Sequence, residues 1–289
     1  MKADSEIDKN AVVKAYLYGD TVELSTSNIN NHQQSILVIS DHRYVDLTTG
    51  EIKQMNTNAN SRVGNLSSVK RTMHSLRRLI ANNFDGGNDQ LWITLTYGVD
   101  INAHNLNDTK VVYQDFKNFI SKLRKVKGRL EYIAVIEPQL SGRWHLHLLL
   151  KTLDGEELYI PNNIVQKLWC KGFTKTKRLF NSDNVASYVM AYLSDLKVNS
   201  GNQKVNAKGA RLYMYPKGIR IYRRSKGIKD PVMKTDIKQR LLNQYDLSDK
   251  DRRATYERSF STKDGKKIVN KNEFYNKKGG NDDDKVNSD

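Results

Sequence analysis

The chain has 289 residues, of which 48 are Lys or Arg and 32 are Asp or Glu, so its formal net charge at pH 7 is +16. Its single cysteine, Cys170, excludes an internal disulfide, and no apolar run approaches the ~20 residues that a membrane-spanning helix needs. These features predict a cytoplasmic protein with a hydrophobic core of its own and no membrane partner, and the positive charge favours a polyanion as ligand.

Residues 1–60 alternate short apolar runs with turn residues, which predicts weak strands. Residues 67–84 then repeat apolar side chains at three- and four-residue steps, with basic residues between them, which predicts an amphipathic helix with a basic rim. We expect these elements to form an N-terminal segment, residues 1–84, that packs on the domain after it.

A central domain is predicted over residues 85–232. Its runs are too short and too mixed for regular strand-helix-strand units, and neighbouring strands read as antiparallel. The fold class expected is therefore α+β, with a central antiparallel sheet of about five strands and flanking helices. The expected strands cover 91–97, 131–136, 144–151 and two runs within 211–223, and the expected helices cover 109–127, a short stretch after Pro161, and 182–196.

Positive charge is concentrated in residues 197–230, which hold ten Lys or Arg and a single acid, Asp230. Such a segment can be a solvated surface, but its density is typical of phosphate contact, so nucleic acid is the expected partner. Residues 211–223 are expected to form a hairpin around Pro216, with Ile219 and Ile221 toward the core. The side chains expected to guide DNA by stacking and phosphate contact are Arg211, Tyr213, Tyr215, Lys217, Arg220, Tyr222, Arg223 and Arg224.

Residues 233–289 are expected to form a C-terminal helical segment followed by a disordered, charged tail. Ser248 and Asp251 have the spacing of a capping box, in which each side chain bonds the other residue's backbone at a helix start. The tail is rich in Lys, Asn and Asp, a composition that cannot bury enough apolar surface to fold.

His145 and His147 are two apart in a predicted strand, so both imidazoles leave the same face and can bind one cation. Alone, this pattern more often marks two ordinary strand histidines. Glu137 ends the neighbouring strand and can add a carboxylate, although it can also be a turn residue before Pro138. Two histidines and one acid suit Mn²⁺ or Mg²⁺ with a phosphate, and the same set also admits Zn²⁺.

Tyr188 and Tyr192 are four apart on the helix expected over 182–196, and are therefore neighbours on one face. Tyrosines at this spacing usually pack in a core. Close to a metal that polarises a phosphate, however, a phenol can act as a nucleophile despite its ordinary pKa of about 10.

The order of these features resembles the HUH endonuclease superfamily: the strand 92–97, then His145-Leu146-His147, then a helix with tyrosines. Because the tyrosines follow the histidines, the chain is most similar to rolling-circle replication initiators of small Gram-positive plasmids, over about residues 85–225. The resemblance implies an RRM-like Rep endonuclease fold over 85–232, a divalent ion held by Glu137, His145 and His147, and Tyr188 and Tyr192 as catalytic nucleophiles. The spacing of Val185 to Tyr188 favours Tyr188 for the first attack, but the order of the two stays open.

The resemblance also implies a function: site-specific nicking and rejoining of one strand at a plasmid origin, through a 5′-phosphotyrosine link and without ATP. The implied partners are single-stranded or hairpin origin DNA, a host polymerase, and a host helicase, since the sequence has no Walker-type phosphate loop. Two alternatives remain. A conjugative or mobilisation relaxase uses the same chemistry, and a non-catalytic nucleic-acid-binding module has a similar sheet with surface aromatics.

Overall fold

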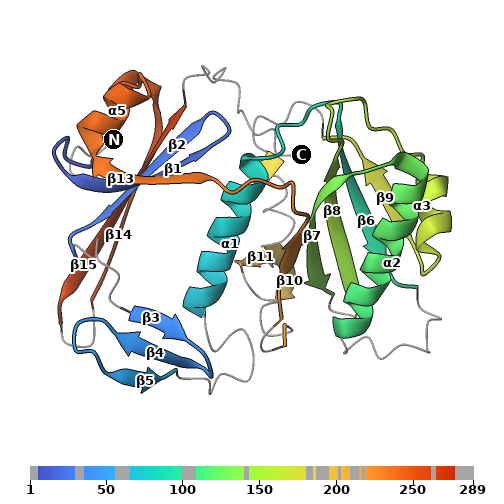
Figure 1. The fold of residues 1–289 in the computed structure, drawn as a ribbon, viewed down its shortest axis with the longest axis horizontal. Helices are drawn as coiled ribbons and strands as arrows, with labels where there is room; N and C mark the ends of the chain where they lie inside the picture. Colours follow the sequence, from blue (N-terminus) through green and yellow to red (C-terminus); the bar gives the residue numbers. More distant parts are fainter. Residues whose placement is uncertain are drawn as a thin grey trace. The chain divides into compact units, whose positions relative to one another are not determined.

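The computed structural model describes residues 6–29, 36–55, 66–98, 109–139, 143–179, 185–186, 195–200, 203–208, 215–216, 219–261 and 265–276. The chain divides into two compact units, one of Met1–Thr57 with Pro231–Asp289 and the other of Asn58–Asp230 (Figure 1). The first and last segments of the chain thus share one unit, and the basic amphipathic helix falls in the other. In the described part of the chain, no helix is both long and apolar enough to cross a membrane.

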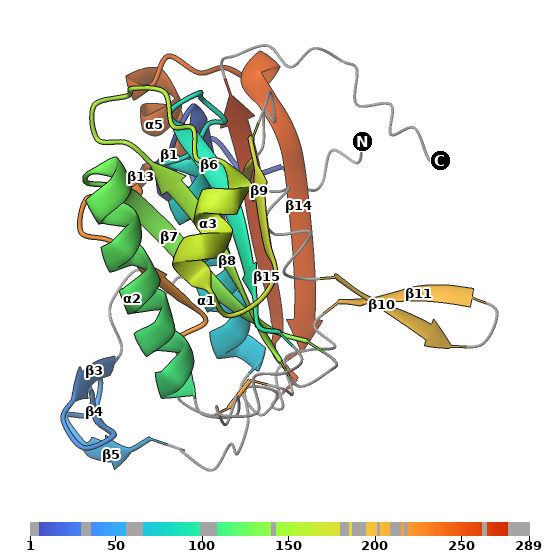
Figure 2. The same ribbon diagram turned by 90° about the vertical axis from the view of Figure 1, so that its right-hand side faces the viewer.

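The unit of residues 58–230 is built on a five-stranded antiparallel sheet in the order β12-β7-β8-β6-β9, which confirms the predicted α+β class. One helix, α1, covers one face of this sheet, and α2 and α3 cover the other (Figures 1 and 2). The bounds are α1 Leu66–Ala81, β6 Gln90–Thr96, α2 Thr109–Lys127, β7 Glu131–Pro138, β8 Trp144–Lys151, α3 Asn162–Trp169, β9 Thr174–Lys177 and β12 Tyr222–Arg224. A separate pair of strands, β10 Asp195–Ser200 and β11 Gln203–Lys208, forms a two-stranded sheet.

The core of this unit lies on both faces of the sheet. Helix α2 buries a stripe at helical spacing, including Val112, Phe116 and Leu123, because those positions share the side that faces the strands. Strand β8 is covered on both faces, so its run from Leu146 to Leu150 is buried without alternation. Each apolar side chain fully buried in this way contributes about 1.5 to 3 kcal/mol. Polar side chains in the middle of such a sheet need a specific partner.

The expected helix over 182–196 is only partly visible. Val185 and Ala186 are helical and buried in the core, whereas residues 182–184 and 187–194 lie outside the described residues. The last two positions of the prediction are wrong, because strand β10 begins at Asp195 and pairs with β11.

The other unit contains a five-stranded antiparallel sheet in the order β13-β1-β2-β15-β14 and a three-stranded sheet, β3-β4-β5. Val13, Leu24, Leu241 and Tyr275 are among the residues of its core. The bounds are β1 Val12–Tyr18, β2 Thr21–Ser27, β3 Ile36–Ile39, β4 Arg43–Asp46, β5 Ile52–Gln54, β13 Val232–Ile237, α5 Lys238–Gln244, β14 Arg252–Ser261 and β15 Lys267–Asn276. The strands expected in residues 1–60 are thus present.

The expectation of a helical C-terminal segment is wrong over most of its described length. Helix α5 is present, and Ser248 and Asp251 form the predicted capping box, but on a 3₁₀ turn. Residues 252–261 and 267–276 are long strands instead. They form because β15 pairs with β2, more than two hundred residues earlier in the chain, and β14 pairs with β15. The tail expected to be disordered, from residue 277 onward, lies outside the described residues.

Candidate metal centre

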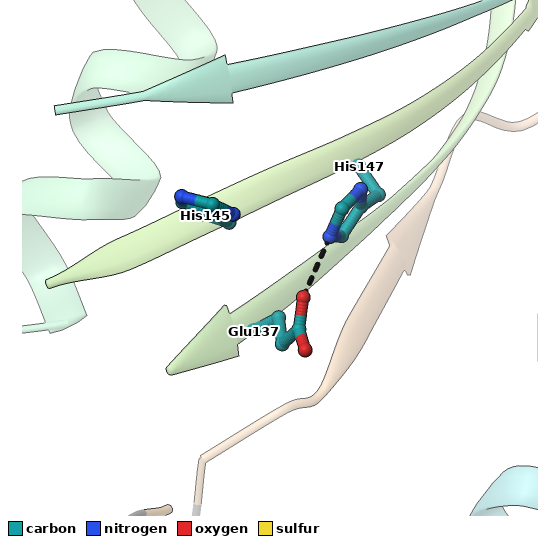
Figure 3. A group of neighbouring side chains, drawn as sticks. All are labelled: Glu137, His145 and His147. Atoms are coloured by element: carbon teal, nitrogen blue, oxygen red, sulfur yellow. Dashed lines mark hydrogen bonds and ion pairs between the residues drawn. The ribbon is translucent and has the colours of Figure 1, made fainter. Parts of the chain in front are cut away.

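The register of β7 against β8 brings the three predicted ligands to one place. Glu137 lies directly opposite His145, and Val135 lies opposite His147. Residues opposite each other, and residues two apart on one strand, project from the same face of a sheet. Figure 3 shows the three side chains gathered on one side of these two strands. The predicted grouping of Glu137, His145 and His147 is therefore present.

The three side chains are close enough to share one cation. Each offers one ligand atom, and these atoms all lie within 4.8 Å of one another. Nε2 of His147 is 2.8 Å from Oε2 of Glu137, and each of those two side chains is only 7% exposed (Figure 3). The His145 ring is partly exposed, with its centroid 6.0 Å from that of His147. Glu137 is thus a buried carboxylate facing an imidazole and not a turn residue in solvent.

The donor set fits a divalent metal ion. Two neutral imidazole nitrogens and one carboxylate oxygen form a mixed nitrogen and oxygen site that leaves coordination positions open for a substrate. A buried carboxylate is costly unless a positive charge or a hydrogen-bond donor compensates it, and here the His147 ring is beside it. The arrangement is compatible with a divalent metal site, and the three ligand types do not by themselves select one ion.

Thr94 of β6 orients His147 from the other side. The two residues are directly opposite each other, and Oγ1 of Thr94 is 3.4 Å from Nδ1 of His147. If the ring proton is on Nδ1 and points at Thr94, the lone pair of Nε2 faces Glu137 and is available to an ion. Trp92 also contacts the His147 ring edge to face, with centroids 5.8 Å apart. Sequence reasoning did not single out Thr94 or Trp92 for this role, although both lie in the predicted strand 91–97.

The end of β6 is fixed from the opposite face of the sheet. The Tyr97 hydroxyl donates to Oδ2 of Asp115 at 3.0 Å, and Nζ of Lys171 lies 3.1 Å from Oδ1 of the same carboxylate. Burial, together with the negative Asp115, raises the pKa of Tyr97 above its ordinary value. Trp169 donates its indole N–H to the Thr96 carbonyl at 2.9 Å. These contacts hold β6 in the position from which Thr94 meets His147.

Gly172 allows the loop before β9 to approach this strand end closely. Its φ is +145°, and a Cβ at this position would lie 2.3 Å from the Thr96 carbonyl oxygen. No other residue fits here without moving the backbone.

The predicted nucleophiles, Tyr188 and Tyr192, lie outside the described residues. The same holds for three of the predicted DNA-binding residues, Arg211, Tyr213 and Lys217.

The described DNA-binding candidates differ in their surroundings. Arg220 and Arg223 are exposed, and the Arg223 guanidinium lies 3.6 Å from the centroid of the Tyr113 ring. Arg224 makes two contacts of 2.6 Å with the Asp230 carboxylate. This pairing lowers the pKa of Asp230 and raises that of Arg224.

Tyr215 is a correction to the predicted hairpin faces. It was expected on the outer face, but it is only 3% exposed, its ring packs against Trp144, and its hydroxyl donates to the Ile136 carbonyl at 2.8 Å. A tyrosine can be buried in this way when its hydroxyl finds an acceptor. Ile219 and Ile221 are buried as predicted. Tyr222 is half-buried, and this burial raises the pKa of its hydroxyl.

Residues 90–197 match the family model of the Replication-associated protein ORF2. The matched range begins with β6 and includes Glu137, His145 and His147 as well as both predicted tyrosines. Searches of curated proteins and of solved structures gave no significant match. The family match supports a replication-initiator role for the part of the chain that carries the metal centre.

Proposed function

We propose that this protein is a rolling-circle replication initiator that nicks and rejoins one DNA strand at a plasmid origin, by metal-dependent chemistry with a phosphotyrosine intermediate. The observation that carries the proposal is the position of Glu137, His145 and His147, whose ligand atoms lie within 4.8 Å of one another inside the range matched to a replication-associated family. A purely structural role for this group would leave a carboxylate and two imidazoles together on one sheet face without a reason.

The chain's own residues divide the work. Glu137, His145 and His147 hold the cation, for which we propose Mn²⁺ or Mg²⁺; when bound, such an ion polarises the scissile phosphate and stabilises the charge that develops on it. Thr94 keeps Nε2 of His147 directed toward the site through its contact with Nδ1. The buried Glu137 supplies the negative charge that offsets the cation.

The covalent step is assigned to Tyr188 or Tyr192. A phenolic oxygen attacks the phosphorus and loses its proton, the bond from phosphorus to the 3′ oxygen breaks, and that oxygen leaves as a hydroxyl after taking up a proton. The 5′ phosphate stays linked to the tyrosine, and the free 3′ end can prime a host polymerase. Attack of a 3′-OH on the phosphotyrosine reverses the step, so rejoining needs no ATP. Single-stranded or hairpin origin DNA and a host helicase are the partners we propose with it.

Two alternatives predict different results. A relaxase uses the same chemistry, and the match to a replication-associated family favours the initiator. A simple nucleic-acid-binding module needs no metal, and the paired Glu137 and His147 favour a metal site over it.

The test is cleavage of end-labelled single-stranded origin DNA in Mn²⁺ and in EDTA, resolved on a denaturing gel. We expect wild-type protein to cut only with Mn²⁺, and His145→Ala and His147→Ala to lose cleavage while keeping most of their DNA affinity. His42→Ala is the matched control, since His42 is exposed and lies in the other unit. Full cleavage in EDTA, or by His147→Ala, would contradict the proposal.

A further inference from the structure

The face of the sheet that carries the metal centre continues to its outer edge. Thr94 of β6 pairs with His147 of β8 on one side and with Lys175 of β9 on the other. His147 in turn pairs with Val135 of β7. Residues paired directly across an antiparallel sheet project from the same face, so Lys175 and His147 stand in one row on one face.

Lys175 is within reach of a ligand at that centre. Adjacent strands are about 4.8 Å apart, so the backbones of Lys175 and His147 are separated by about 10 Å. A lysine side chain spans about 6 Å of this distance with its flexible four-carbon stem. The strand β9 is at the edge of the sheet, and Lys175 is exposed there. In the part of the chain that the structure describes, no carboxylate is paired with it.

The charges along this row are suited to a phosphodiester. Glu137 is negative and, without a cation, repels a phosphate, whereas Lys175 adds a positive charge on the same face. The Thr94 side chain lies between them, and hydroxyl groups are common donors to backbone phosphates. Lys177 is two residues further along β9 and extends the positive edge on that face.

We propose that Lys175 binds a backbone phosphate of the DNA strand that crosses this face to the metal centre. The inference rests on the proposed function for the identity of the ligand and names the part of the sheet over which the strand passes. The bland alternative is that Lys175 only protects an exposed edge strand from pairing with another chain, which is a common role of lysine at sheet edges.

The first test measures binding without cleavage. The probe is a fluorescent oligothymidylate in EDTA, and its affinity is measured by anisotropy over a range of salt concentrations. For Lys175→Gln we expect the slope of log affinity against log salt to become less steep by about 0.7, the change for one lost phosphate contact with a single strand. Lys175→Arg should keep the wild-type slope.

The control is Lys117→Gln, which removes one exposed charge from α2, on the opposite face of the sheet. It should leave the slope unchanged. A slope for Lys175→Gln equal to that of wild type, or a Lys117→Gln effect of the same size, would overturn the proposal. Aggregation of Lys175→Gln with an unchanged slope would assign the residue to edge protection.

The second test locates the contact. Single methylphosphonates, which remove the charge of one phosphate, are placed along an origin oligonucleotide around the cleavage position mapped with wild type. Lys175→Gln and the methylphosphonate should fail to add at a phosphate close to the nick and add elsewhere. Additivity at every position would overturn the placement. Absence of any wild-type nick would refute the proposed function, while the salt slope would still decide whether Lys175 binds a phosphate.

Discussion

The Glu137 carboxylate lies 2.8 Å from Nε2 of His147, although the residue directly opposite Glu137 across the strand pair is His145. Glu137 therefore reaches diagonally along the sheet and places its carboxylate beside both histidines. This diagonal contact is what turns a common His-x-His pattern into a three-ligand group, because neither strand alone brings an acid to the two rings.

Glu137→Gln is expected to weaken Mn²⁺ binding by at least about 10-fold, the lower end of the loss seen when even an indirect partner of a metal ligand is removed. Gln keeps the size of the side chain and can still accept a hydrogen bond, so the fold should survive while the negative charge is lost. Isothermal titration calorimetry with Mn²⁺ measures the change. Glu156→Gln, at an exposed position, is the control. Equal affinities in the two variants would show that Glu137 is not a ligand.

Thr94→Val tests the orientation of His147. Valine has nearly the shape of threonine but cannot accept the proton of Nδ1, so the ring loses its contact at 3.4 Å. We expect a loss of about 10- to 100-fold in Mn²⁺ affinity, with partial recovery in Thr94→Ser, which keeps the hydroxyl. Thr176→Val of β9 is the control, because that hydroxyl contacts Asn162 and not the site. A Thr94→Val protein with wild-type affinity would remove Thr94 from the centre.

The metal centre could be predicted from sequence because its geometry follows from local rules. His145 and His147 share a face by the two-residue period of a strand, and Glu137 ends the preceding strand, so a short connection brings it opposite. Thr94 could not be assigned in the same way. Its position against His147 depends on the register of β6 with β8, strands separated by more than fifty residues, and no local pattern fixes that register.

The C-terminal strands escaped prediction for a related reason. Strand β14 exposes most of its side chains on both faces, so it lacks the alternation of apolar and polar residues that identifies a strand. Its partner β15 is held by pairing with β2 near the start of the chain, where Asn272 lies opposite Ser25. Tyr215 shows the same limit in a side chain, because the Ile136 carbonyl that accepts its hydroxyl is distant in sequence.

The basic residues near β12 should contribute unequally to DNA binding. Arg224 is paired with Asp230 through two contacts, so part of its charge is already compensated, whereas Arg220 and Arg223 are exposed. The double change Arg220→Gln with Arg223→Gln should reduce the salt slope of single-stranded DNA binding by up to about 0.7 per lost contact. Arg224→Gln should change it less. The reverse ranking in a salt titration would assign the phosphate contact to Arg224.

Tyr97→Phe tests how firmly β6 is held. The change removes the hydrogen bond to the buried Asp115, and we expect a loss of about 1.5 to 3 kcal/mol in the free energy of unfolding near pH 8. Because the pKa of Tyr97 is raised in the folded state, only the unfolded wild-type chain loses this proton as the pH passes about 10. The stability that the hydroxyl gives is therefore lost at alkaline pH, and the gap between wild type and variant should narrow.

Urea unfolding at pH 8 and pH 10.5 measures that gap. Tyr159→Phe, at an exposed position, should show little difference from wild type at either pH. A gap for Tyr97→Phe that widens with pH would show that the hydroxyl is not held protonated by Asp115.

The most direct test of the account is the covalent protein-DNA adduct formed on labelled origin DNA in Mn²⁺ and resolved under denaturing conditions. Wild type should form the adduct, and EDTA, His147→Ala and the double change Tyr188→Phe with Tyr192→Phe should each abolish it. If Tyr188 attacks first, Tyr188→Phe alone should also form none, whereas Tyr192→Phe should still form it. A denaturation-resistant adduct from the double Phe variant would contradict the assignment of the tyrosines, and one from wild type in EDTA would contradict the metal centre itself.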